Sequence, residues 1–175
     1  MKTRTLWINV AGPCNSNCPF CFGNVREKTD QDNRLLRKSL PEALEFAKFV
    51  GVDTAVITSG GEALVHRSFI FHLLGELRQA GIPKRELHTN GLIPYQDPSC
   101  LEDLEFAGAT TLVLKVASQD PRRSAQIMEV GVDYLELAQR VAERGLICRI
   151  LLNLLKEEEK KTLEQFPKYV DLLFK

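Results

Sequence analysis

The chain has 175 residues, 44% of them hydrophobic and 26% charged, and its 23 basic residues balance its 23 acidic ones. This length and composition predict one domain with a substantial core. A net charge of zero gives no electrostatic reason to expect a nucleic-acid partner or an anionic membrane. No apolar run approaches the roughly 20 residues of a membrane span, and Asn9 breaks the short run after the basic N-terminus, so a signal peptide is not expected. Five cysteines in a chain without a leader favour a reducing, cytoplasmic location.

Runs rich in β-branched residues alternate with amphipathic stretches along the chain. We expect strands at about 5–10, 54–58, 86–89, 110–116, 146–152 and 169–174. We expect helices from Ser39 to just before Gly51, and at 67–80, 99–107, 133–144 and 157–166. Three of these helices open on a Ser or Asp with a glutamate three positions later, at Ser39, Ser99 and Asp133, which is the spacing of a capping box.

Strands that alternate with helices predict parallel βαβ units. Six strands and five helices are too few for a closed eightfold barrel, which takes about 250 residues. We therefore predict an α/β fold: an open, partial (β/α)6 TIM-like barrel of six parallel strands that ends on the sixth. An open doubly wound sheet is the alternative. Residues 1–175 would form one domain, either minimal or lacking a final helix and a C-terminal extension. In both folds, ligands bind at the C-terminal ends of the strands.

The first strand leads into a loop that holds Cys14, Cys18 and Cys21, spaced C-x3-C-x2-C. Glycine, proline and asparagine surround these cysteines, so the loop can turn its thiols inward around one centre. A structural zinc ion takes four ligands, and none of the other cysteines or histidines is close in the sequence. Iron–sulfur clusters are usually held by four thiolates. Three thiolates would therefore leave one iron of a four-iron cluster open to a reactant.

This spacing, with Phe20 just before the last cysteine, resembles the cluster motif C-x3-C-x-aromatic-C of the radical S-adenosylmethionine (radical SAM) enzymes. The family's six-strand partial barrel agrees with the fold expected from the chain length. The resemblance implies that Cys14, Cys18 and Cys21 hold a [4Fe–4S] cluster on a loop spanning 11–38. The open iron would bind the amino and carboxylate groups of S-adenosylmethionine. One electron would cleave the C5′–S bond, and the resulting 5′-deoxyadenosyl radical would abstract hydrogen from a substrate.

The resemblance also implies residues that bind S-adenosylmethionine. Phe20 would pack near the adenine. After the second strand, Gly60-Gly61-Glu62 resembles the family's Gly-Gly-Glu motif, in which the backbone and the carboxylate hold the amino group of the methionine. The family usually has proline next, whereas this chain has Ala63.

Further candidates follow the third, fourth and fifth strands. Asn90, in a Thr-Asn-Gly sequence that is also a common turn, would line the cofactor pocket. Lys115 ends an apolar strand, so it is either a solvated terminus or the partner of the methionine carboxylate, with a place in the catalytic centre. Ser118 is a second candidate for that carboxylate or for the ribose, and Asn153 lies at the functional end of strand five. His88 is either a general acid or base or an ordinary core histidine.

The resemblance implies an external reductant, such as a flavodoxin or ferredoxin, and an unidentified small-molecule or peptide substrate. A glycyl-radical enzyme is an alternative substrate. The small size and the single cysteine cluster favour that alternative, whereas the branch that activates such enzymes has Asp-Leu-Lys where this chain has Val113-Leu114-Lys115. Cys100 and Cys148 are expected to be ordinary thiols. An alternative of another class is a non-catalytic iron–sulfur or zinc-binding module, and an inactive fragment is a further possibility.

Overall fold

The computed structural model describes residues 3–21, 30–118 and 120–153. The strands within these ranges form one parallel sheet: β1 (Thr5–Val10), β2 (Thr54–Ser59), β3 (Lys84–Thr89), β4 (Thr111–Val116) and β5 (Ile147–Leu152). The larger helices are α1 (Asp30–Val50), α2 (Arg67–Gln79), α4 (Ser99–Ala107) and α6 (Tyr134–Glu143). The expected sixth strand and the helix at 157–166 lie outside the described residues. Among the described helices, none is long and apolar enough to cross a membrane.

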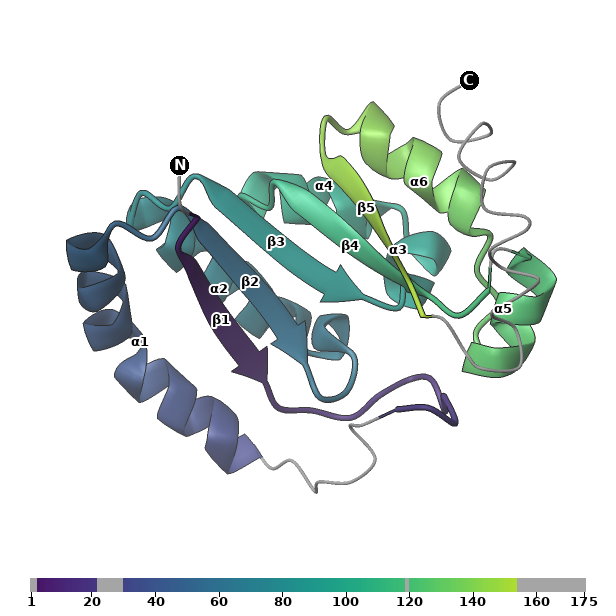
Figure 1. Ribbon diagram of the computed structural model, residues 1–175, viewed down its shortest axis with the longest axis horizontal. Helices are drawn as coiled ribbons and strands as arrows, with labels where there is room; N and C mark the ends of the chain where they lie inside the picture. The colour runs from purple at the N-terminus through teal and green to yellow at the C-terminus, as the bar shows by residue number, and fades with distance from the viewer. Residues whose placement is uncertain (1–2, 22–29, 119, 154–175) are drawn as a thin grey trace.

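The strand order is β1-β2-β3-β4-β5, so each strand pairs with its neighbour in sequence. Because parallel crossovers are almost always right-handed, an order that never reverses places every connecting helix on the same face of the sheet. A doubly wound sheet instead reverses its order at a switch point. The observed order therefore confirms an open, partial barrel and excludes the alternative. In Figure 1, α2 and α4 lie behind the sheet, and α1 and α6 flank its two ends.

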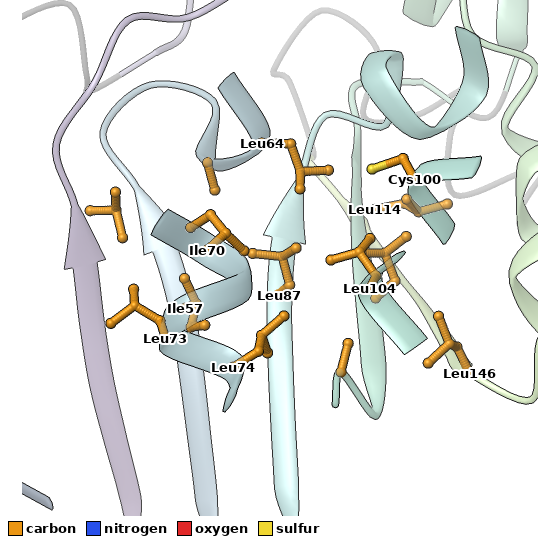
Figure 2. Packing of buried hydrophobic residues seen from close by; sticks show 14 of the residues in the cluster. Ile57, Leu64, Ile70, Leu73, Leu74, Leu87, Cys100, Leu104, Leu114 and Leu146 are labelled. Carbon is orange, nitrogen blue, oxygen red and sulfur yellow. The ribbon is translucent and has the colours of Figure 1, made fainter. Parts of the chain in front are cut away.

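The hydrophobic core lies between the sheet and its helices. Ile70, Leu73 and Leu74 of α2 are fully buried, and Figure 2 shows them directed toward Ile57 of β2 and Leu87 of β3. Burying an aliphatic side chain of this size contributes roughly 1.5–3 kcal/mol. The alternate side chains of each strand point the other way, onto the concave inner face, where polar residues can meet a ligand.

Helix α1 begins earlier than expected. It starts at Asp30, so the predictions of a helix start at Ser39 and of a cluster loop running to residue 38 are wrong. The Ser39 hydroxyl donates to the carbonyls of Leu35 and Leu36, which is how a serine behaves inside a helix. The added turns are held by a tertiary contact, since the Asn33 side chain accepts from the N–H of Ala11 at 2.9 Å and donates to its carbonyl at 2.8 Å.

The connections hold short helices that the sequence periodicity did not reveal. They are η2 (Ala63–His66), α3 (Leu92–Gln96) and α5 (Pro121–Met128). Asp133 caps α6 as expected, by accepting from the N–H groups of Leu135 and Glu136. The expected capping box at Ser99 is not formed, because the Asp97 carboxylate accepts from the Ser99 N–H at 3.2 Å and the helix begins at Ser99 itself.

Candidate active site

A cavity of about 590 Å³ lies where the strands end. Cys14, Cys18 and Cys21 all line it. They share the cavity with residues from the ends of strands that lie much further along the chain, such as Asn153. Most of the other residues proposed from the sequence also line it: Phe20, Gly60, Gly61, Glu62, Asn90, Lys115 and Asn153. Ser118 does not line this cavity. It is only 6% exposed, and its hydroxyl accepts from the N–H of Asp120 at 3.3 Å in the turn after β4.

Several lining residues were missed by the sequence analysis. Trp7, Asn9, Thr58 and Leu151 come from the strands, where Asn9 pairs in register with Thr58. Their positions follow from the two-residue alternation of side chains, which would have found them once the buried face of each strand was known. The others lie in the cysteine loop, at the last residue of β2 and at the end of α5, where the sequence periodicity gives no signal: Ser16, Ser59 and Met128.

The thiols of Cys14 and Cys18 sit in a setting that raises their pKa and so disfavours bare thiolates. Burial raises the pKa of Cys14, and the nearby charges of Glu62, Cys18 and Cys21 raise it further, against a lowering contribution from the Ser16 backbone. Burial also raises the pKa of Cys18, although the Ser16 hydroxyl and Lys115 act in the opposite direction. Thiolates here need positive charge close by, which bound iron supplies as it displaces their protons.

The donor set fits an iron–sulfur cluster better than a single ion. Among the described residues, no group of three or more His, Cys, Asp or Glu side chains converges closely enough to hold one metal ion. A zinc ion needs its thiolates at about 2.3 Å from one point. In a cluster each iron takes its own thiolate, so three sulfurs need only surround a common space. Three thiols on one cavity wall meet that looser requirement.

The glycine turn packs directly against the start of the cysteine loop. A Cβ atom on Gly61 would lie 2.3 Å from the Gly12 carbonyl oxygen and 2.4 Å from that of Pro13. The next residue, Glu62, donates its N–H to the Pro13 carbonyl at 3.0 Å. Only a glycine lets the two loops approach so closely, which explains the residue type without reference to any ligand.

The loop is also fastened at its far side. The Ser16 hydroxyl donates to the carbonyl of Met128 at the end of α5 and lies 2.9 Å from the sulfur of Cys18. The Asn90 side-chain amide donates to the side-chain carbonyl of Asn15 at 2.7 Å. The cysteine loop is therefore tied to the ends of β3 and α5 as well as to the glycine turn.

Glu62 is almost completely buried, with 3% of its surface exposed. Burial raises the pKa of its carboxyl, against lowering contributions from the N–H groups of Asn90 and Leu64, the Thr89 hydroxyl and, last, Lys115. The Oε1 atom accepts from the Thr89 hydroxyl at 2.7 Å and from the Leu64 N–H at 3.1 Å. The Oε2 atom accepts from the Asn90 N–H at 2.8 Å.

A second cavity, of about 770 Å³, continues along the inner face toward the start of the strands. Trp7 and Leu151 line both cavities. In the second one, the Arg149 guanidinium makes two hydrogen bonds, of 2.8 and 3.0 Å, to the buried carboxylate of Glu86. Burial lowers the pKa of the neighbouring His88 to about 4, with the positive charges of Lys115 and Arg149 adding to the effect, so this imidazole is neutral at pH 7.

Known proteins resemble this chain in sequence and in structure. A curated relative from Methanocaldococcus jannaschii, named 7,8-dihydro-6-hydroxymethylpterin dimethyltransferase, is 31% identical over 144 residues, which cover 78% of this chain and 26% of the relative. The crystal structure of Streptococcus suis SuiB bound to S-adenosylmethionine matches with a TM-score of 0.65 and 25% identity, over 95% of this chain and 36% of SuiB. SuiB bound to its precursor peptide SuiA matches with a TM-score of 0.64 and 27% identity, over 94% of this chain and 36% of SuiB.

The chain thus spans about a quarter of the pterin methyltransferase and about a third of SuiB. The family model described as the radical SAM superfamily matches residues 8–170. That range includes the cysteine loop, the glycine turn and all five described strands. The chain therefore belongs to the radical SAM superfamily.

Proposed function

We propose that this chain cleaves S-adenosylmethionine reductively and uses the radical so formed to abstract hydrogen from a small-molecule or peptide substrate. Membership of the radical SAM superfamily implies a [4Fe–4S] cluster and S-adenosylmethionine, and it makes the protein an enzyme. The observation that carries the proposal is the meeting of three loop thiols, the glycine turn and Lys115 on one cavity. When bound, the cluster and S-adenosylmethionine supply an electron and a 5′-deoxyadenosyl radical.

The chain's own residues bind and orient these groups. The thiolates of Cys14, Cys18 and Cys21 hold the cluster at the open end of the barrel. The ammonium of Lys115, on the cavity wall, pairs with the methionine carboxylate, since a charge-assisted hydrogen bond is about twice as strong as a neutral one. Phe20 offers an apolar surface to the adenine, and Asn153 offers an amide at the edge of the cavity. Ser118 remains a candidate for the methionine carboxylate or the ribose, but its hydroxyl would first have to leave its hydrogen bond with the Asp120 N–H.

The substrate is proposed to enter by the inner face of the sheet, where the second cavity adjoins the first at Trp7 and Leu151. The names of two relatives mention a pterin and a precursor peptide, so both a small molecule and a peptide are reasonable substrate classes for this chain. A glycyl-radical enzyme is a special case of the peptide class. We further propose a flavodoxin or ferredoxin as the electron donor and the cytoplasm as the location.

Anaerobic reconstitution with iron and sulfide tests the proposal. After reduction with dithionite and addition of S-adenosylmethionine, the wild type should release 5′-deoxyadenosine, detected by chromatography, and Cys18→Ala should not. Cys148→Ala is the matched control, because Cys148 lies on β5 and packs against the core without lining the cavity. Cys148→Ala should keep both the iron and the product. Formation of a zinc site with no four-iron cluster would instead support the non-catalytic alternative.

Lys115→Met separates the cofactor site from the cluster site. The substitution keeps the length of the side chain and removes the ammonium, so S-adenosylmethionine should bind about tenfold more weakly, the equivalent of losing roughly 1.4 kcal/mol. The iron content after reconstitution should stay at the wild-type level, because Lys115 holds no iron. Unchanged affinity measured by equilibrium dialysis would remove Lys115 from the proposed binding site.

A further inference from the structure

The Glu62 carboxylate is engaged by the protein itself. Three donors reach it: the N–H of Leu64 in the adjoining η2 and, from the end of β3, the hydroxyl of Thr89 and the N–H of Asn90. A carboxylate has about four acceptor positions, so these donors occupy most of its capacity. The family resemblance assigned this side chain to the ammonium of S-adenosylmethionine, but its geometry here suits a link between the ends of β2 and β3.

Asn90 continues that link to the cysteine loop. Its N–H is held by Glu62, its side-chain carbonyl accepts from the Leu92 N–H at 3.1 Å, and its backbone carbonyl accepts from the Tyr134 hydroxyl at 3.0 Å. With these groups fixed, the side-chain amide can point only one way, and it donates to Asn15 at 2.7 Å. Asn15 directly follows Cys14.

We propose that Glu62 is a positioning residue for the cysteine loop, which it holds in place through Asn90 and Asn15. The carboxylate fixes the turn after β3, the turn aims the Asn90 amide, and the amide fixes the loop next to Cys14. This inference rests on the proposed function only in treating that loop as the cluster loop, since every contact in it is made by the chain alone. Glu62 thereby serves cluster assembly before S-adenosylmethionine arrives.

Glu62→Gln weakens this link with little change in volume. A glutamine presents N–H groups on one side, so its amide either faces the Asn90 N–H and loses that hydrogen bond, or faces the Leu64 N–H and offers Asn90 only a neutral carbonyl, which is a weaker acceptor than a carboxylate. Hydrogen–deuterium exchange on the reduced, cluster-free protein should then show amides in 12–21 exchanging about tenfold faster, while amides of β2 and β3 keep their wild-type rates. A general loss of stability would speed the strands as well.

Asn15→Ala is the second variant and leaves the buried carboxylate untouched. Because Asn15 is exposed on the loop, its substitution should not prevent folding, and it should speed exchange in 12–21 to a similar degree. If the effect of Glu62 passes through Asn15, the double variant should exchange no faster than either single one. Glu76→Gln, at a half-buried position of α2 that lines neither cavity, is the matched control and should match the wild type.

Three results would overturn the inference. They are wild-type exchange in the loop of Glu62→Gln, faster exchange spread over the whole sheet, and full additivity in the double variant. The outcome is separate from that of the proposed function, because the exchange measurement needs neither iron nor S-adenosylmethionine. In reconstituted protein, the same two variants should lower the iron bound per chain, measured by colorimetric assay, whereas Lys115→Met should not.

Discussion

Gly61→Ala should drive the glycine turn and the cysteine loop apart. The new Cβ atom would lie 2.3 Å from the Gly12 oxygen and 2.6 Å from the Pro13 carbonyl carbon, about 1 Å inside the ordinary contact range that starts at 3.4 Å. All of these atoms belong to the backbone, so no side chain can rotate away. The loops must separate, and the hydrogen bond from the Glu62 N–H to the Pro13 carbonyl, 3.0 Å long, should be lost.

The cost can be worked out from these contacts. Overpacking at a rigid site costs about 1–3 kcal/mol, and the lost backbone hydrogen bond adds about 1 kcal/mol. We expect a loss of roughly 3 kcal/mol, which lowers Tm by about 6–12 °C in a domain of this size. Thermal unfolding of the reduced, cluster-free protein, followed by circular dichroism, measures this directly. Iron bound after reconstitution should fall as well, because the displaced segment leads into Cys14.

Gly75→Ala is the matched control. Gly75 lies within α2, and a Cβ atom there would meet nothing within 4 Å. Replacing a helical glycine by alanine stabilises a helix by about 0.8–1.0 kcal/mol, so this variant should melt about 2–4 °C above the wild type. If Gly61→Ala melted within about 1 °C of the wild type, the close approach of the two loops would be refuted.

Three further predictions concern the inner face of the sheet and one helix start. Because the pKa of His88 is lowered from 6.5 to about 4, the unfolded state binds a proton between these values that the folded state does not, so stability should fall as the pH drops through this window. The free energy of unfolding, measured with urea, should fall less between pH 7 and pH 5 in His88→Gln than in the wild type. An equal fall in the two proteins would contradict this prediction. Arg149→Leu leaves the Glu86 carboxylate, 5% exposed, without its partner. The free energy of unfolding should fall by roughly 1–2 kcal/mol, and adding Glu86→Gln should restore most of it. If the losses of the two single variants simply added in the double variant, the ion pair would be refuted. Asp133→Ala removes the cap of α6, which accepts from two N–H groups, and should lower the free energy of unfolding by about 1 kcal/mol. An unchanged urea unfolding curve would show that the cap is dispensable.

The strands could be predicted closely because their signal is local. β1 has the expected bounds, and the other four strands in the described part of the chain begin and end within about two residues of expectation. Runs of β-branched residues, closed by glycine or polar turns, carry this information in adjacent positions. The helix starts were predicted less well. Ser39 has the sequence pattern of a cap but lies inside α1, because contacts of Asn33 with the end of β1 extend the helix past that signal.

The candidate site could be predicted in part for the same reason. The cysteine spacing and the glycine turn are short motifs, and the rule that ligands gather at strand ends puts them on the same side. Ser118 was predicted to bind the cofactor because it lies close to Lys115 in the sequence. In the structure its hydroxyl instead accepts from the Asp120 N–H within the loop after β4. Met128 was missed because α5 has too few residues for a periodic signal.

The sequence by itself determined where the strands run, which loop carries the thiols and which family the chain resembles, since each of these depends on residues that are neighbours in the chain. Only the tertiary structure decided the strand order, the sharing of one cavity by Cys14, Lys115 and Asn153, and the engagement of Glu62 by Thr89 and Asn90. These features join segments separated by tens of residues. Their pairing depends on how the whole chain packs, and no local pattern of residues encodes that.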